Sequence, residues 1–307
     1  MGYSAMPDEI RSFNLQVIGL TTGGSAAGVL GGLVDDLLEF EVPAAVVESV
    51  EPRLREDLIE MFLYPPGRDR SFRPTHRDKL LAAVDKELQT MTTFGTVVRA
   101  WRTDPLTITV SLSATWDPDP HAERLIDTNI TLVGEDPLVF PPDLIETILE
   151  YTTQYCNTVA VRNGGSAAST ATTSELTRPL FYLTEWNPYR RETPPTVFSY
   201  GWIEVLAPEL VEHLGGLDTM SRGCPAHRVV PYECPTGTGA ILQATPQPSD
   251  LTGETLQTWR DWLQVLFPPL RSPGPDRDCR PTPTWITQQD LELCPSWQPG
   301  WLPTWER

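Results

Sequence analysis

The chain has 307 residues, enough for one large domain or two ordinary ones, and enough to bury a core without metals or disulfides. Hydrophobic residues make up 40% of it and charged residues 21%, which excludes a chain that is disordered throughout. With 41 acids against 23 bases the formal charge is −18, so neither a nucleic acid nor an anionic membrane surface is an expected partner.

No targeting segment is expected at the start of the chain. The first residues, MGYSAMPDEIRS, carry acids where a secretory signal needs basic residues. The long uncharged stretch 12–34 contains polar side chains and many glycines, which disfavours a membrane span. These features predict a soluble, cytoplasmic protein.

Strand and helix patterns alternate in the first forty residues. The apolar run 14–20 predicts a strand. Leucine and valine then recur at helical spacing over 30–38, which predicts a helix with Ser25 as its N-cap.

Two more helices are predicted before residue 90. One follows Pro52, and the other follows the capping-box pattern Thr75-x-x-Asp78. The residues assigned to the inward face of the first of these helices are Leu54, Leu58, Met61 and Phe62.

The strongest strand patterns come next. Apolar residues alternate with threonine and serine over 106–113, and the pattern returns over 126–132. The segment between them, WDPDPHAER, is rich in proline and acids, so a hairpin with an exposed loop is predicted. Pro141-Pro142 then begins a predicted helix on which Glu146 and Glu150 share the solvent side.

A small-residue segment, NGGSAASTATT at 163–173, is interpreted as a linker or long loop. Strand patterns follow it near 180–186, 197–206, 226–232 and 239–244. Helices are predicted over 208–214, where Gly215-Gly216 ends the helix, and over 256–266, and Trp202 and Trp259 are expected in the core.

The order of elements predicts an α+β fold of antiparallel hairpins with covering helices. Residues 1–271 are predicted to form one unit, with an internal boundary at 163–173 as the alternative. Residues 272–307 hold seven prolines and four tryptophans and are predicted to form an irregular extension.

The negative charge is concentrated in two segments. Residues 1–60 hold 11 acids and 3 bases, and residues 103–160 hold 10 acids and 1 base. Solvated faces explain such runs most simply. The functional alternative is an acidic surface that steers a basic protein partner toward the chain.

Motifs for catalysis are missing from the sequence. It has no G-x-S-x-G nucleophile elbow and no phosphate-binding glycine loop, so no catalytic residue and no cofactor is predicted. The one loose metal-ligand pattern is Cys224, His227 and Cys234, to which Cys279 or Cys294 could add a fourth ligand. Ordinary loop residues and free thiols are the preferred interpretation.

Two stretches of the second half carry a family resemblance. YGWIEVLAPELVEHLGGL begins at Tyr200, and GAILQATPQPSDLTGETLQTWRDWLQVLFPPL begins at Gly239. Together with the upstream PPDLIETILEYTTQY, they resemble the bacterial type VI secretion immunity proteins over about residues 139–273. The features shared are a Gly-Trp strand, a short helix ending in Leu-Gly-Gly, a Gly-led strand ending in Ala-Thr-Pro, and a helix with a Leu-x-Pro close.

The resemblance implies a non-catalytic protein that neutralises a cognate toxin by covering its active site. It carries over no catalytic residues. Two alternatives are a scaffolding component that docks through its Trp-rich extension, and a metal-dependent hydrolase built on Cys224, His227 and Cys234.

A basic partner also needs aromatic anchors within the acidic surround. Two loops, WDPDP and EWNPYRRE, combine tryptophan with polar and proline neighbours. The predicted partner-binding residues are Trp116, Asp117, Asp119, Trp186 and Tyr189.

Overall fold

A computed structural model describes residues 10–21, 26–43, 58–63, 70–90, 95–102, 107–114, 124–134, 140–170, 195, 197, 201–251 and 253–266. The strands are β1 (Ile10–Thr21), β2 (Leu58–Leu63), β3 (Arg70–Phe72), β4 (Gly95–Arg102), β5 (Thr107–Ala114), β6 (Arg124–Val133), β7 (Ala160–Thr170), β8 (Ile203–Leu206), β9 (Arg228–Cys234) and β10 (Gly237–Gln243). The helices are α1 (Ala26–Glu39), α3 (Arg77–Thr90), α4 (Pro142–Thr158), α5 (Pro208–His213), α6 (Leu217–Gly223) and α7 (Gly253–Leu263), with 3-10 turns at Pro74–His76, Pro248–Asp250 and Gln264–Leu266.

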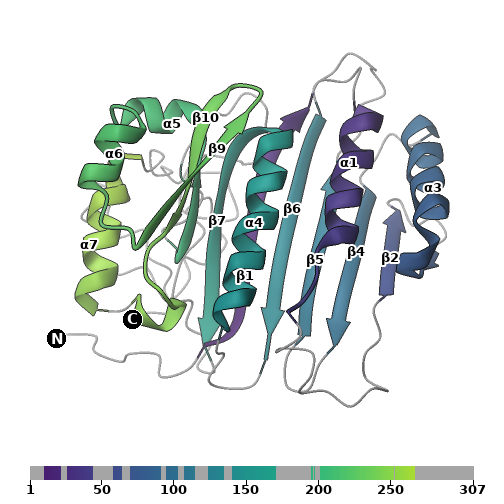
Figure 1. Ribbon diagram of the computed structural model, residues 1–307, viewed down its shortest axis with the longest axis horizontal. Helices are drawn as coiled ribbons and strands as arrows, with labels where there is room; N and C mark the ends of the chain where they lie inside the picture. The colour runs from purple at the N-terminus through teal and green to yellow at the C-terminus, as the bar shows by residue number, and fades with distance from the viewer. Residues whose placement is uncertain are drawn as a thin grey trace, which may run out of the picture.

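All ten strands belong to one antiparallel sheet, in the order β3-β2-β4-β5-β6-β1-β7-β8-β10-β9 (Figure 1). The predicted α+β class is therefore confirmed. The β5–β6 hairpin is confirmed as well, because these two strands pair directly from Thr107 opposite Val133 to Ala114 opposite Ile126. Its alternation follows from burial of one face: Ile108, Val110 and Leu112 are buried, and the threonines and serines between them lie on the other face.

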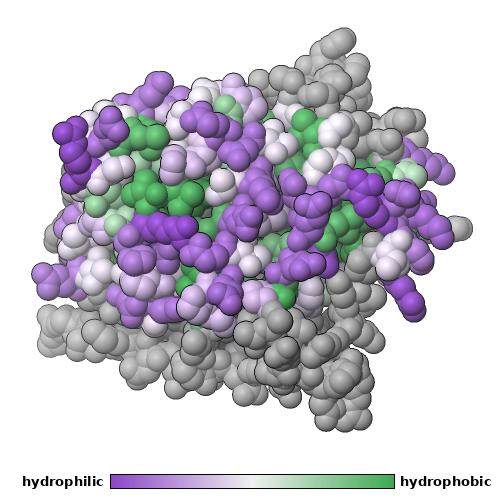
Figure 2. Space-filling view, viewed as in Figure 1, coloured by the Kyte–Doolittle hydropathy of each residue, from purple (hydrophilic) through white to green (hydrophobic). Residues whose placement is uncertain are grey.

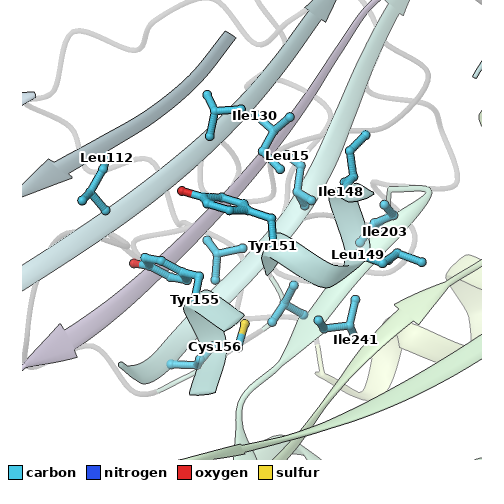
Figure 3. Packing of buried hydrophobic residues seen from close by; sticks show 14 of the residues in the cluster. Leu15, Leu112, Ile130, Ile148, Leu149, Tyr151, Tyr155, Cys156, Ile203 and Ile241 are labelled. Atoms are coloured by element: carbon cyan, nitrogen blue, oxygen red, sulfur yellow. The ribbon is translucent and has the colours of Figure 1, made fainter. Parts of the chain in front are cut away.

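Helices α1, α3 and α4 lie on the same face of the sheet (Figure 1). In α1 the predicted helical stripe is buried, with Leu33, Val34 and Leu37 almost fully removed from solvent. Figure 3 shows Tyr151, Tyr155 and Cys156 of α4 among core residues from five strands. Those residues are Leu15, Leu112, Ile130, Ile203 and Ile241.

The C-terminal part of the sheet is also held to its helices by buried side chains. Trp202 and Trp259 are 1% and 2% exposed, which confirms their predicted place in the core. The indole of Trp202 donates to the carbonyl oxygen of Thr245, and that of Trp259 donates to the carbonyl oxygen of Gly201. These bonds satisfy both buried N–H groups while the rings fill the interior.

The short helix α5 ends as its sequence predicts. Gly215 and Gly216 have φ angles of +88° and +86°, a region that suits glycine. The Gly216 N–H donates to the carbonyl oxygen of Val211, and the Gly215 N–H donates to that of Glu212. This pair of bonds is a Schellman motif, which satisfies carbonyls that the helix end leaves free.

The helix predicted after Pro52 is wrong in its second half. Residues 58–63 form strand β2, which pairs with β3 and β4, and Ile59 and Met61 are its buried residues. Leu58, Met61 and Phe62 have the spacing of a helix face, but the run LIEMFL is apolar at five of its six positions, so Ile59 and Met61 also give the period of a strand, and strand pairing decided the outcome. Leu54 lies outside the described residues, and Thr75 lies in the 3-10 turn before α3, so that helix begins at Arg77.

The linker predicted at 163–173 is also wrong, because residues up to Thr170 belong to strand β7. This strand pairs with β1 on one side and with β8 on the other. The neighbouring strands leave little room for a side chain at Gly164, since a Cβ atom there would lie 3.0 Å from side-chain carbons of both Val17 and Val205. Residues 171–173 lie outside the described part of the chain, as do the predicted strand at 180–186 and the extension 272–307.

Candidate functional site

The last turns of α1 carry acids on the side that faces away from the sheet. Glu39 is exposed, and Asp35 and Asp36 are partly exposed, while Leu33 and Leu37 point into the core. The helical period places these acids opposite the apolar stripe.

Helix α4 presents a second group of acids in the same way. Asp143, Glu146 and Glu150 are exposed, and Leu144 and Ile148 between them are fully buried. The predicted solvent side of this helix is thus confirmed. Pro142 in the first turn pre-sets the backbone for a helix, and Asp143 lies beside it where the helix dipole favours a negative charge.

The fold places the helices that carry these two acidic groups side by side, because α1 and α4 contact each other on the sheet (Figure 1). Figure 2 shows hydrophilic side chains gathered along the middle of this face, over α4 and α1. We call this surface the acidic face. Its members are Asp35, Asp36, Glu39, Glu41, Asp143, Glu146 and Glu150.

Asp36 lies between Asp35 and Glu39 in the last turns of α1. Burial raises the pKa of its carboxyl above the ordinary value, and the charges of Glu39 and Asp35 raise it further. Asp36 also contributes to the raised pKa of the buried Tyr151 hydroxyl on α4, after burial itself. The carboxylates of Asp35, Asp36 and Glu39 therefore repel one another, and a cation brought to this end of α1 would relieve that repulsion.

Two arginines border the acidic face. Arg77 at the start of α3 pairs with Asp35, and Arg228 of β9 pairs with Glu146. The side chains of both pairs are partly or largely exposed to solvent, which screens the attraction, so neither pair contributes much to stability. They leave Glu39, Asp143 and Glu150 with no partner among the described residues.

A groove lies between α4 and the edge strand β9. Its volume is about 350 Å³. From α4 it is lined by Glu146, Leu149, Glu150, Thr153 and Gln154. From β9 it is lined by Arg228 and Val230.

Among the described residues, the alternative metal site at Cys224, His227 and Cys234 is not assembled, and Cys279 and Cys294 lie outside the described part of the chain. Strand β9 runs between His227 and Cys234, and seven residues of strand extend over about 20 Å. Among the residues that the structure describes, no group of three or more His, Cys, Asp or Glu could hold a metal ion. Cys156, Cys224 and Cys234 are free thiols, as the sequence predicts.

The residues predicted to bind the partner all lie outside the described part of the chain. They are Trp116, Asp117, Asp119, Trp186 and Tyr189. The charge pattern is the signal that did lead to the acidic face, since α1 and α4 come from its two acidic segments. Reasoning from the sequence missed the groove, because nothing in the sequence indicates that β9 lies beside α4.

Within the described ranges, no helix is long and apolar enough to cross a membrane. No family model matches the chain, and no curated protein matches it. Among solved structures, the Pseudomonas aeruginosa T6SS protein PA0821 aligns over 84% of this chain and 78% of its own, with 12% sequence identity and a TM-score of 0.48. That protein is a distant structural neighbour named for type VI secretion, and these comparisons show no immunity family.

Proposed function

We propose that this protein binds a basic protein partner through the acidic face and catalyses no reaction itself. One observation carries the proposal: acids from two segments more than a hundred residues apart lie on the solvent sides of two adjacent helices. The acids at the end of α1 repel one another in the isolated chain, which helps to raise the pKa of Asp36, and a basic partner would relieve that repulsion. Opposite charges across an interface also raise the rate of association.

The partner we propose is a toxin of bacterial competition, which the protein would neutralise by covering its active site. This finer assignment depends on the resemblance of residues 139–273 to type VI secretion immunity proteins. The stretches that carry the resemblance form α4, β8–α5 and β10–α7 in the fold. Helix α4 therefore belongs both to the stretches that resemble the family and to the acidic face.

The test is binding to the toxin candidate encoded beside the gene for this chain. The double variant Asp143→Lys/Glu150→Lys changes two exposed acids of the acidic face. Its matched control, Glu212→Lys/Glu254→Lys, makes the same change of net charge on α5 and α7. We expect the first variant to slow association at low salt by about tenfold or more, and the control to stay close to the wild type.

Raising the ionic strength should shrink the difference between the two variants, because screening removes long-range attraction. Equal slowing by both variants would mean that only the net charge matters, and the acidic face would lose its role. An association rate that neither variant changes would contradict the proposal outright.

A further inference from the structure

The groove between α4 and β9 is flanked by two side-chain bridges. At one end Arg228 pairs with Glu146. Beyond the other end Asn157, three residues after Gln154, accepts a hydrogen bond at 3.0 Å from the backbone N–H of Glu233. The two bridges link the helix and the strand on either side of the groove, and its walls are regular elements rather than loops.

The groove has an apolar floor and an acceptor-rich rim. Leu149 is buried at its base, with Val230 partly buried opposite. The hydroxyl of Thr153 donates to the carbonyl oxygen of Leu149 at 2.7 Å, which leaves its lone pairs available as acceptors. Arg228 neutralises Glu146, and Glu150 then supplies a net negative charge at the rim.

An added β-strand does not fit this place. Strand β9 is at the edge of the sheet, but Pro231 in its middle has no N–H to give to a neighbouring strand. Helix α4 already contacts that edge and takes the N–H of Glu233. The groove therefore suits a side chain and not a backbone.

We infer that the groove receives an arginine side chain of the basic partner. Its aliphatic stem would lie on Leu149 and Val230, and its guanidinium would reach Glu150, with the Gln154 amide oxygen one helical turn further on. Arginine is the charged residue that most often anchors protein interfaces. The inference rests on the proposed function in one respect: it names the part of the partner that docks beside the acidic face.

The groove can be tested without the partner. N-acetyl-arginine amide is titrated into the full chain while backbone amide NMR shifts are followed, and N-acetyl-citrulline amide serves as the uncharged probe of the same shape. We expect saturable shifts centred on Thr153, Gln154 and Val230 for arginine, in the millimolar range of dissociation constants, and none for citrulline. Equal binding of the two probes, or arginine shifts scattered over other acidic residues, would overturn the inference.

Two variants sharpen this test. Gln154→Trp fills the groove from an exposed rim position with no change of charge, and should abolish the saturable shifts. Glu150→Gln should weaken arginine binding by at least about threefold, as the loss of a partly exposed charge pair implies. Glu212→Gln on α5 makes the same substitution outside the groove and should have no effect. Unfolding midpoints of all three verify that each variant is folded.

The same variants separate this inference from the proposed function. Suppose that Gln154→Trp leaves the affinity for the toxin candidate unchanged while Asp143→Lys/Glu150→Lys slows association. The partner would then bind through the acidic face, and the proposed arginine site would be wrong. If Gln154→Trp weakens that affinity tenfold or more, the groove is a docking site. An increase in the solution mass of the wild type that Gln154→Trp removes would show a second copy in the groove, and would overturn the inference.

Discussion

Arg99 lies on β4 with its guanidinium buried beneath the last turn of α1. Its Nη1 atom donates to the carbonyl oxygens of Leu37, Leu38 and Phe40, at 3.2, 2.5 and 2.7 Å. The guanidinium carbon also lies 4.5 Å from the ring centre of Trp101. These carbonyl oxygens accept no hydrogen bond within the helix, and a cation at the C-terminal end of a helix is stabilised by the helix dipole. One buried residue of the sheet thus fixes the acidic end of α1.

We predict that Arg99→Met destabilises the fold by about 2–4 kcal/mol, because the helix-end carbonyls lose a buried charged donor. Urea unfolding followed by circular dichroism measures the change. Arg222→Met, at an exposed arginine on α6, is the control and should stay within about 0.5 kcal/mol of the wild type. Equal stabilities of the two variants would show that the buried contacts of Arg99 contribute nothing net.

Asp127 belongs to a polar network on the sheet face opposite the helices. The side chain of Gln16 donates to Asp127 Oδ2 at 2.9 Å, and Asn14 donates to Asn129 Oδ1 at 3.1 Å. Burial raises the pKa of Asp127 from 3.8 to about 6, although the hydrogen bond from Gln16 lowers it. The folded state therefore holds this proton more tightly than the unfolded chain.

The consequence is a loss of stability as the pH rises from about 4 to about 6, because the folded protein must ionise a buried carboxyl there. We predict that Asp127→Asn raises the free energy of unfolding at neutral pH by about 1–3 kcal/mol and changes it little near pH 4. Urea unfolding at the two pH values measures this. Asp143→Asn, at an exposed acid, should follow the wild type, and a destabilising effect of Asp127→Asn at neutral pH would contradict the prediction.

At the scale of elements, β7 and β8 depend on a close approach of backbones. A Cβ atom added to Gly201 would fall on the carbonyl oxygen of Ser166 in β7. The hydroxyl of Ser166 meanwhile accepts a hydrogen bond at 2.8 Å from the N–H of Ile203. Because the contacting atom belongs to the backbone of Ser166, it cannot move out of the way as the end of a flexible side chain could.

We predict that Gly201→Ala costs about 2–3 kcal/mol of stability, as overpacking against fixed atoms does. Gly223→Ala is the matched control, since a Cβ atom there meets nothing within 4 Å. Thermal unfolding of the two variants under one condition gives the comparison. Equal unfolding temperatures for Gly201→Ala and the control would mean that the segments around Gly201 and Ser166 can move apart without loss of stability.

Elements differ in how well their sequences predicted them. Helices α1 and α4 and strands β5 and β6 each bury one face against a single layer, so their apolar residues show the period of the element. Strand β7 lies between two strands and is made of small and polar residues, such as the buried Asn163 and Ser166. Such a segment has the composition of a linker, and only pairing with β1 and β8 makes it a strand.

At the scale of the whole molecule, the ten strands form one hydrogen-bonded sheet in which β1 and β7 join the two halves. Core residues of the two halves belong to one cluster, as Phe13 of β1 shows by lying edge-on to both Phe140 and Trp202. The described strands of the two halves thus share one sheet and one core.

We predict that the slowest-exchanging amides of β5 and of β10 open with the same free energy, within about 1 kcal/mol, because both exchange through global unfolding. Native-state hydrogen exchange in low urea measures the two values. A gap of about 2 kcal/mol or more would instead reveal two cooperative units, and would revive an internal boundary near the end of β7.

The sequence by itself determined the class of fold, the buried stripes of α1 and α4, the β5–β6 hairpin, the end of α5 at Gly215-Gly216, and the two acidic segments. These features are local, since periodicity, turn chemistry and charge are properties of a few neighbouring residues. Tertiary structure alone decided that β2 and β7 are strands, that Arg99 holds the end of α1, and that the acids of α1 and α4 share one face. The reason is physical: each of these features depends on partners tens to a hundred residues away, whose positions are set by strand order and by packing into a common core.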